Sequence, residues 1–197
     1  MKRIIQLVLL GLAVLFAYML YDSIASEIEF NEEIAKRKEV VIKKLEDIRD
    51  AQIAYKSVKG KYAKTFPELI QFLEKDSMPL IYAEGEVPDS LIGQEAKAIE
   101  LGIIKRDTSL IPVKDTLFKG RFNEVISDIS IIPFSGGKEF IMDAGEVERG
   151  KVKVKVFEVK APYKYIYNGL DTKNRDIDLE DGLILGSMVD PTTNGNW

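Results

Sequence analysis

Cysteine and histidine are both absent from this chain of 197 residues. Serine–histidine and cysteine–histidine catalysis require an imidazole base, and the common zinc sites require histidine or cysteine, so the chain alone supports neither. Without cysteine the fold has no disulfide, even in an oxidising compartment, and no lipid attached to a thiol. The fold must therefore be held together by its core, which a hydrophobic content of 46% allows.

A strong excess of charge is also lacking, because the net charge is only −4. This mild value gives no indication of a nucleic-acid partner. The 32 acidic residues are scattered without a distinctive motif, so no carboxylate pair for acid–base catalysis can be selected. We assign no catalytic, cofactor-binding or metal-binding residue, and we expect a protein that is not an enzyme.

Charged residues are missing between Arg3 and Asp22. The run Ile4–Leu20 is apolar apart from one glutamine and one glycine. A helix over residues 4–24 reaches about 30 Å, which is the thickness of the hydrocarbon core of a bilayer. The sequence therefore predicts a single transmembrane anchor over residues 4–24.

The charges on either side of the run predict its orientation. Lys2 and Arg3 precede it, and positive flanks stay in the cytoplasm, whereas the far flank beginning at Asp22 is acidic. We expect a cytoplasmic N-terminus of residues 1–3 in a bacterial inner membrane and a C-terminal domain in the periplasm. The alternative is a cleaved signal peptide, with the small residues Ser23 and Ala25 at the cleavage site. An uncleaved anchor is favoured because the apolar run exceeds the ~7–15 residues of a usual signal core.

The helical pattern continues beyond the anchor and becomes amphipathic. No glycine or proline interrupts the chain from Asp22 to Lys59, and Gly60 is a natural stop, so residues 25–59 are predicted to form an extracytoplasmic spine helix. One apolar stripe recurs at helical spacing: Phe30, Ile34, Val41, Leu45, Ile48, Gln52 and Tyr55.

The apolar stripe has two interpretations. It either packs against the chain's own sheet, or its membrane-proximal part packs against other copies or partner helices. The stripe is sparse between Ile34 and Val41, where Lys38 replaces an apolar residue. This gap favours an exposed proximal segment and tight packing only from Val41 onward.

The remainder, residues 60–197, predicts a globular α+β domain. Thr65 caps a short helix with Pro67 in its first turn. Residues 77–118 look irregular, apart from a short helix over Gln94–Leu101. Three strands joined by short glycine-containing turns form an antiparallel meander, and two more segments are candidate edge strands. The three strands are Val125–Phe134, Glu139–Val147 and Lys151–Val156, and the edge candidates are Tyr163–Tyr167 and Leu183–Val189. The predicted architecture is a transmembrane helix continuing into a long amphipathic helix that lies across an antiparallel sheet.

This order of parts resembles the type IV pilins and the pseudopilins of type II secretion. The local match is an Ala-x-x-x-Tyr run followed by Gly-x-Tyr and a short helix, and it is carried by Ala51, Tyr55, Gly60, Tyr62 and Leu69. The resemblance implies assembly into a filament. Prepilins, however, carry a glycine before the apolar run and a glutamate within it, and this chain has neither. The sequence therefore indicates a pilin-like architecture on a permanently anchored protein.

Three segments raise the question of a site. Asp176, Asp178, Glu180 and Asp181 offer oxygen ligands that calcium prefers, but the spacing is not that of an EF-hand, and a solvated acidic turn is the favoured interpretation. Lys151, Lys153 and Lys155 form a basic edge, which either meets anionic lipid or an acidic partner or protects an edge strand from aggregation. Residues 190–197 read as a loop ending in the single tryptophan, Trp197, which docks either on the domain or on a partner.

Together these features predict a non-enzymatic, membrane-anchored component of an envelope assembly. Its most concrete form is a pilin-like or pseudopilin-like subunit or accessory factor of a secretion or filament apparatus. The first alternative is an accessory subunit of an energised transport or motor complex of the inner membrane, and the second is a tethered enzyme or ligand-binding protein. The expected partners are membrane lipid and other envelope proteins, or copies of the chain, bound through the anchor and the spine helix. The sequence gives no indication of a cofactor, and it leaves a small-molecule ligand open.

Overall fold

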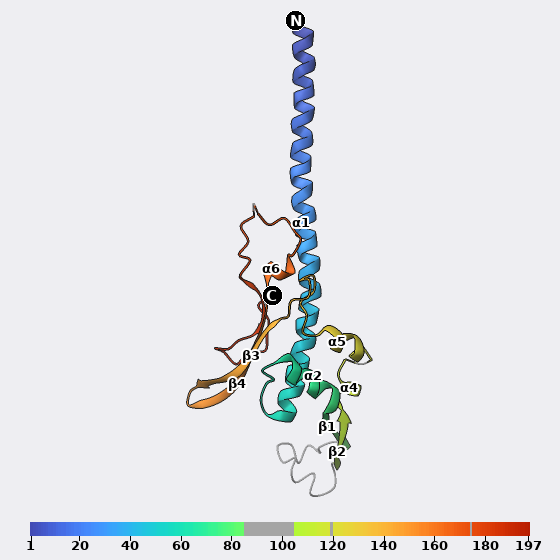
Figure 1. The fold of residues 1–197 in the computed structure, drawn as a ribbon, viewed down its shortest axis with the longest axis vertical. Coiled ribbons are helices and arrows are strands. Elements are labelled where there is room, and N and C mark those ends of the chain that lie inside the picture. The colour runs from blue at the N-terminus through green and yellow to red at the C-terminus, as the bar shows by residue number, and fades with distance from the viewer. Residues whose placement is uncertain (85–104, 119, 174) are drawn as a thin grey trace, which may run out of the picture.

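The computed structural model describes residues 1–84, 105–118, 120–173 and 175–197. Within these residues it has the expected α+β class, with one very long helix and two antiparallel sheets (Figure 1). The long helix, α1 (Lys2–Lys59), projects far beyond the domain at its N-terminal end, and the domain surrounds its other end (Figure 1).

Helix α1 is continuous over 58 residues, a length of about 87 Å. Its end is the predicted one: Gly60 adopts the left-handed conformation, with φ of 71°, and its N–H donates to the Lys56 carbonyl at 2.9 Å. Glycine takes this conformation without the steric cost that a Cβ brings, so Gly60 closes the helix and turns the chain.

The burial along α1 confirms the prediction for the apolar stripe. Val41, Leu45 and Ile48 are completely buried, whereas Phe30 and Ile34 are only half-buried. Tight packing therefore begins at Val41, where the sequence pattern becomes regular.

The chain returns along α1 through a short second helix, α2 (Phe66–Lys75). Thr65 occupies the N-cap position with an extended backbone, and Pro67 lies in the first turn, as predicted. The Thr65 side chain, however, forms no capping hydrogen bond. The helix is held by its apolar face, from which Phe66, Leu69, Phe72 and Leu73 enter the core.

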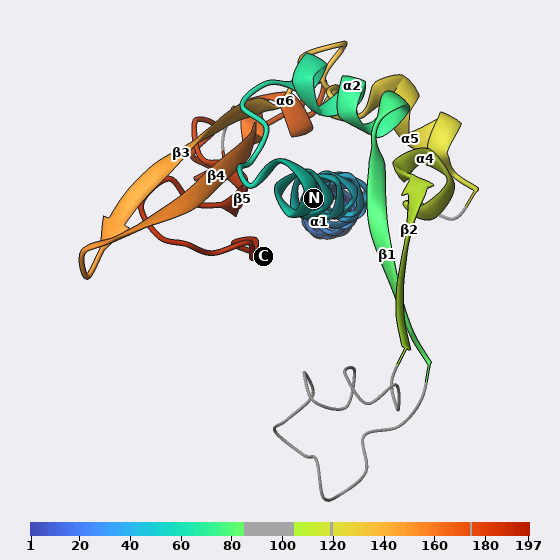
Figure 2. The same ribbon diagram turned by 90° about the horizontal axis from the view of Figure 1, so that it is seen from below.

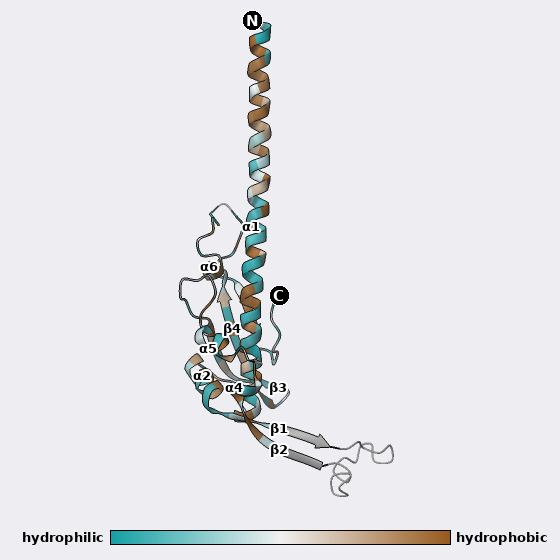
Figure 3. Ribbon diagram, turned by 90° about the vertical axis from the view of Figure 1, so that its right-hand side faces the viewer, coloured by the Kyte–Doolittle hydropathy of each residue, from teal (hydrophilic) through white to brown (hydrophobic). Residues whose placement is uncertain are grey.

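A β-ribbon replaces part of the segment that was expected to be irregular. Strands β1 (Ser77–Glu84) and β2 (Lys105–Pro112) pair antiparallel over their full lengths, from Ser77 with Pro112 to Glu84 with Lys105. The ribbon projects sideways from the far end of the domain (Figure 3). It is followed by the helical turn α4 (Val113–Thr116). The helix predicted over Gln94–Leu101 lies outside the described residues.

The strand predicted over Val125–Phe134 is wrong over its first part, where the chain forms the helix α5 (Phe122–Asp128). At its end, Ile131 forms an antiparallel β-bridge with Glu139 across the turn that follows. Val125 is buried on α5, and Ile129 is buried directly after the helix ends. This step of four residues is helical spacing, which the alternating interpretation overlooked. The predicted Ser135–Lys138 turn is present, and the Lys138 N–H donates to the Ser135 hydroxyl oxygen at 2.8 Å.

The main sheet contains β3 (Ile141–Arg149), β4 (Val152–Pro162) and β5 (Gly182–Gly186), in the order β3-β4-β5. The hairpin predicted around Arg149 and Gly150 is confirmed, with Val147 opposite Val154. The third strand of the sheet is β5, an edge strand, which confirms the edge strand expected at Leu183–Val189. The other expected edge strand, Tyr163–Tyr167, is wrong, because the chain leaves β4 at Pro162 and forms the helical turn α6 (Tyr163–Ile166).

Two glycines let β5 approach β4 closely. A Cβ on Gly182 would lie 2.2 Å from the Ala161 carbonyl oxygen, and one on Gly186 would lie 2.3 Å from that of Phe157. Gly186 also has a φ of 74°, which side-chain-bearing residues rarely adopt. Any larger residue at either position forces the two strands apart.

The C-terminal segment was predicted as a loop, and it follows β5 instead of leaving the domain. The Asn196 N–H donates to the Ile184 carbonyl at 3.0 Å, and the Gly186 N–H donates to the Asn194 carbonyl at 2.9 Å. The Trp197 ring lies directly over Gly195, where a Cβ would come within 2.1 Å of it, and the residue is 43% exposed. Trp197 therefore packs on its own C-terminal segment, which is paired with β5 through Gly195 and Leu185.

The core is built around α1 and not on one face of it. Viewed along the helix, the sheet, α2 and the β1–β2 ribbon lie on different sides of α1 (Figure 2). Completely or almost completely buried side chains from α1, α2 and the main sheet form one cluster: Leu45, Ile48, Leu69, Phe72, Phe157 and Leu185. The helix predicted to lie across a sheet thus also passes through the domain as its central element.

Candidate functional site: the exposed half of α1 and its junction with the domain

The first part of α1 presents apolar side chains on all sides. In the run Ile4–Leu20, which we call the exposed segment, Leu12 is 46% exposed and Leu7 is 69% exposed. Figure 3 shows this hydrophobic colouring along the upper helix and its replacement by polar residues further down. Fully covering an aliphatic side chain of this size is worth about 1.5–3 kcal/mol, so the exposed segment as a whole favours an apolar environment by tens of kcal/mol.

By length and composition, α1 contains one candidate membrane span near the N-terminus, and none of its residues there is buried in the protein. It is the single such helix in the described ranges. No other part of the described chain therefore covers the exposed segment.

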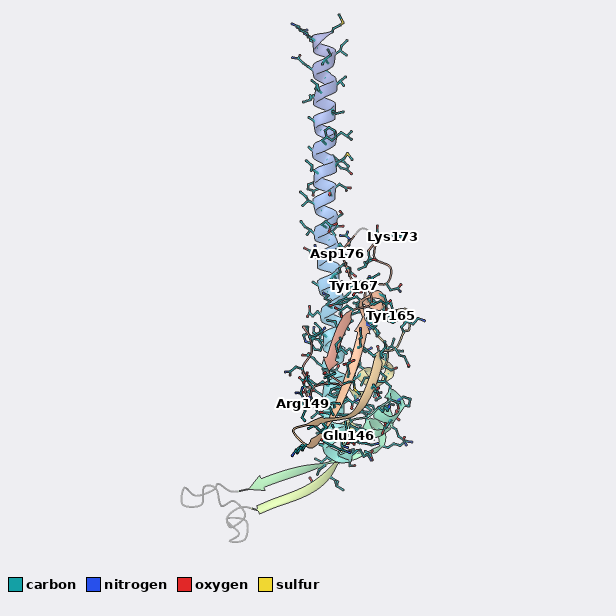
Figure 4. The ribbon with its side chains drawn as sticks, turned by 90° about the vertical axis from the view of Figure 1, so that its left-hand side faces the viewer. Glu146, Arg149, Tyr165, Tyr167, Lys173 and Asp176 are labelled. Atoms are coloured by element: carbon teal, nitrogen blue, oxygen red, sulfur yellow. The ribbon has the colours of Figure 1, made fainter. Side chains whose placement is uncertain are left out.

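A first contact ties the C-terminal part of the domain to α1 just beyond this segment. Arg175 forms an ion pair with Glu27, and its guanidinium carbon lies 3.5 Å from the centre of the Phe30 ring. The loop that carries Lys173 and Asp176 thereby lies beside the helix at the end of the domain nearest the N-terminus (Figure 4).

A second contact lies two to three turns further along α1. Arg37 donates to Glu33 at 2.7 Å and, across the fold, to the carbonyl oxygens of Ile166 at 3.2 Å and Asn168 at 2.9 Å. The hydrogen bond from Arg37 lowers the pKa of the Glu33 carboxyl. Arg37 therefore closes the end of α6, whose last carbonyl groups have no partner within that short turn.

An aromatic pair supports the same region. The rings of Tyr163 and Tyr167 stack at 5.1 Å, and the Lys38 ammonium lies 4.9 Å from the Tyr163 ring centre. Burial raises the pKa of both tyrosines, and the Asp181 carboxylate adds to the rise at Tyr163. Both hydroxyl groups therefore stay protonated, and the two neutral rings pack against each other. We call the contacts of Glu27, Phe30, Arg37 and Lys38 with the domain the junction.

The distal end of α1 is held by a buried amide. Gln52 is completely buried, its Nε2 donates to the Ala63 carbonyl at 2.9 Å, and its Oε1 accepts from the Ala63 N–H at 2.9 Å. The side chain thus pairs both backbone groups of one buried residue. A polar residue within the apolar stripe was the sequence signal for this contact, although its partner was not predictable.

Tyr55 completes this end of the helix. Its hydroxyl donates to Glu68, and its ring packs edge-on against Phe72 at 5.0 Å. Burial, followed by the hydrogen bond to Glu68, raises the pKa of Tyr55 to about 12. The same hydrogen bond lowers the pKa of Glu68.

The residues that carry the resemblance to pilins all have structural roles at this end of the helix. Ala51 and Tyr55 face the core, Gly60 ends the helix, and Leu69 is buried on α2. Tyr62 packs on Phe157 with 4.5 Å between ring centres. The motif therefore marks the place where α1 ends and the following segment, including α2, packs back against it.

The acidic segment does not converge on one point. Asp178 and Asp181 accept from the backbone N–H groups of Glu180 and Gly182, at 2.9 and 2.8 Å, and Glu180 pairs with Lys164 at 2.9 Å. Among the described residues, no group of three or more acidic side chains is arranged to hold a metal ion. These carboxylates act as local turn and ion-pair partners.

The lysines of Lys151–Lys155 lie at the hairpin end of the main sheet. Strand β5 pairs with β4 only from Glu158 to Pro162, so among the described residues this end of β4 has a strand on one side alone, where Lys153 and Lys155 stand opposite Glu148 and Glu146 on β3. Lys155 forms an ion pair with Glu146, close to the end of the domain farthest from the N-terminus (Figure 4). Cross-strand charge pairing accounts for these residues.

A groove of about 630 Å³ lies between α1, α5 and the turn of residues 131–137. Its charges are paired: Lys44 contacts Asp128 at 2.7 Å and the Ile131 carbonyl at 3.0 Å, and Arg121 contacts Asp47 at 3.2 Å. Burial raises the pKa of Asp47 despite the opposing effect of Arg121. These pairs fasten α5 to α1.

Sequence reasoning located α1 and its stop but missed Arg37 and Arg175. No local sequence pattern distinguishes either arginine from the other charged residues. Each contacts a partner more than a hundred positions away, Asn168 for Arg37 and Glu27 for Arg175. No protein-family model, curated protein or solved structure matches this chain.

Proposed function

We propose that this chain is a non-enzymatic component of an envelope assembly, anchored in a bacterial inner membrane by residues 4–24, with its domain in the periplasm. Its role is mechanical: α1 links the membrane-embedded partner surface to the outer domain as one rigid element. The anchor binds lipid and neighbouring membrane helices, and the domain presents the far end of the molecule to other envelope proteins.

One observation carries this proposal: α1 is a single unbroken helix whose first part is exposed and apolar and whose last part is buried in the core. A flexible tether would be sufficient to hold an enzyme near a membrane. A continuous helix that is fixed at its distal end by Gln52 and at the junction by Arg37 transmits displacement and tilt between membrane and domain.

The charge distribution supports the orientation. Lys2 and Arg3 flank the exposed segment on one side, and on the other the chain carries acidic residues until Lys36. Positive residues are retained in the cytoplasm, so the domain lies on the opposite side of the membrane.

The pilin-like subunit is the most concrete form of the proposal, and it is supported by the architecture and the Ala51–Leu69 motif. The missing glycine and glutamate of the prepilin pattern favour a permanent anchor instead of a subunit that leaves the membrane. An accessory subunit of an energised transport or motor complex is therefore the second candidate, since such a subunit stays beside its partner helices.

Three measurements test the anchor and its orientation. The protein should resist extraction from membranes by alkaline carbonate, and its intact mass should include residues 1–25. The chain has no cysteine, so single cysteines report topology without background. In spheroplasts, a membrane-impermeant maleimide should label a cysteine at Lys64, which is exposed, and should spare one at Lys2. Loss of residues 1–25, or labelling of position 2 alone, contradicts the proposal.

A further inference from the structure

The loop between α6 and β5 reaches further toward the N-terminal end of α1 than the other described parts of the domain (Figure 1). Leu170 and Ile177 hold its two ends by packing against the hydrophobic core. Residues 171–173, 175 and 176, which we call the proximal loop, lie between them and are exposed or half-exposed. Figure 4 places Lys173 and Asp176 beside α1 at the end of the domain nearest the N-terminus. The proximal loop is therefore the described part of the domain closest to the predicted span.

Arg175 fixes the proximal loop at one level of α1. Its guanidinium forms an ion pair with Glu27 and lies over the Phe30 ring, 3.5 Å from the ring centre. The Arg175 N–H donates to the Thr172 carbonyl at 3.2 Å, and its Nε donates to the Asp171 carbonyl at 3.1 Å. One residue thus holds both the shape of the proximal loop and its position along the helix.

This position lies in the headgroup layer of the membrane. Glu27 is three residues beyond the predicted end of the span at residue 24, which is about 4.5 Å along a helix axis. The headgroup layer is about 5–8 Å thick on each side, since the hydrocarbon core takes ~30 Å of a total of ~40–45 Å. The proximal loop, held against Glu27, therefore meets lipid headgroups beside the anchor.

The charges of the proximal loop indicate which headgroup fits. Lys173 is exposed, whereas the charge of Arg175 is already paired with Glu27. The exposed carboxylates of Asp171 and Asp176 lie on either side of Lys173 in the chain. A purely anionic headgroup is attracted by the lysine and repelled by both carboxylates. A zwitterionic headgroup, which carries a phosphate and an ammonium, offers a partner to charges of both signs.

We propose that the proximal loop is a second membrane contact, made to zwitterionic phospholipid headgroups such as phosphatidylethanolamine. The Lys173 ammonium binds the lipid phosphate, and the carboxylates of Asp171 and Asp176 bind the lipid ammonium. This inference rests on the proposed function, because the anchor is what brings lipid to the loop. The contact lies to one side of α1, so it opposes tilting of the helix and the domain relative to the membrane.

Quenching by a lipid-borne nitroxide tests the contact. A bimane fluorophore is attached at Thr172→Cys in the full chain, which has no native cysteine, and the protein is reconstituted in zwitterionic nanodiscs. Some of the lipids carry a nitroxide on the headgroup. We expect severalfold stronger quenching at position 172 than at Lys64→Cys, an exposed site beyond the distal end of α1. Because the quencher is part of the lipid, coverage of the label by protein does not imitate the contact.

The charges are tested with Lys173→Glu against Lys75→Glu, a change of another exposed lysine on α2. The first variant should reduce the quenching at position 172 severalfold, and the second should leave it unchanged. Nanodiscs of phosphatidylglycerol with the same fraction of nitroxide lipid should also give weaker quenching, because the carboxylates are then repelled. Equal thermal midpoints of the two lysine variants verify that the domain stays folded.

Three results would overturn the inference. Quenching at position 172 no stronger than at position 64 shows that water or a second copy, and not lipid, lies at the proximal loop. Quenching that is indifferent to Lys173→Glu removes the phosphate contact, and equal quenching in phosphatidylglycerol removes the role of the carboxylates. Failure of the proposed function is distinguished by bimane at Leu12→Cys: a nitroxide on the acyl chain quenches it when the anchor is inserted, whatever the loop does, and leaves it bright when the anchor is not inserted.

Discussion

One buried amide contributes to the attachment of α1 to the domain, and Gln52→Ala tests this contribution. Gln52 satisfies both the N–H and the carbonyl of Ala63, each at 2.9 Å, and both residues are completely buried. Removal of the side chain leaves these two backbone groups without partners in the core. Each unsatisfied buried group costs about 1–3 kcal/mol, so we expect a loss of roughly 2–5 kcal/mol in the free energy of unfolding.

For a domain of this size, 1 kcal/mol corresponds to about 2–4 °C in the midpoint of thermal unfolding, so Gln52→Ala should lower the midpoint by roughly 5–15 °C. The assay is near-UV circular dichroism of the full chain in detergent micelles, which reports on the packed tyrosines. Far-UV signal is less suitable, because the exposed segment stays helical in the micelle. The matched control is Gln71→Ala, an exposed residue on α2. Equal midpoints for the two variants would refute the role given to Gln52.

Three further predictions concern other parts of the fold. Burial, followed by the hydrogen bond to Glu68, raises the pKa of Tyr55 from 10.0 to about 12, and the same hydrogen bond lowers the pKa of Glu68 from 4.5. The stabilisation from this hydrogen bond is therefore complete between pH 4.5 and 10.0, and it is lost as pH falls through the lowered pKa of Glu68 or rises towards 12. Tyr55→Phe should flatten both limbs of the stability–pH curve in chemical denaturation, and an unchanged curve contradicts the assignment. Gly182→Ala should prevent correct folding, because its Cβ overlaps the Ala161 carbonyl, whereas Gly60→Ala, which meets no atom within 4 Å, should cost only about 1 kcal/mol from its left-handed backbone. Expression and thermal midpoints distinguish the two, and similar losses for both would be inconsistent with the close strand approach. Arg175→Ala should leave the thermal midpoint nearly unchanged, since a surface ion pair and a cation–π contact contribute about 1 kcal/mol each at most. It should accelerate hydrogen exchange in residues 170–178, and protection equal to that of the unaltered chain would count against the junction.

The long helix was predictable because its signals are local. The charge-free run, the helical spacing from Val41 onward and Gly60 each act within a few residues of where they stand. The hairpin around Gly150 was predictable for the same reason, since alternating valines follow a glycine turn.

The misassigned elements fail for specific physical reasons. Val125, Ile129 and Ile132 fit a helical face, but the isoleucines between Ile126 and Ile132 also fit a strand, and only packing against α1 decides between them. The β1–β2 ribbon joins strands separated by residues 85–104, so its pairing depends on partners that no local pattern identifies. Tyr163–Tyr167 has strand-forming residues, yet Pro162 ends the β4 ladder and the chain turns.

The junction could not have been predicted from sequence. Arg37 and Arg175 lie in segments rich in charge, and their partners are chosen by the folded path of residues 162–181 past α1. Gln52, in contrast, stood out as a polar residue in an apolar stripe, so its burial was implied and its hydrogen bonds were not.

The central claim is that α1 runs without a hinge from the membrane into the domain, and one distance measures it. Spin labels at Leu20→Cys and Lys43→Cys, introduced into a chain without native cysteines, are compared by pulsed electron paramagnetic resonance in lipid nanodiscs. A continuous helix at about 1.5 Å per residue predicts a single narrow distribution near ~35 Å. A broad distribution, or one centred well below this distance, would show that the helix bends between anchor and domain and would contradict the mechanical role.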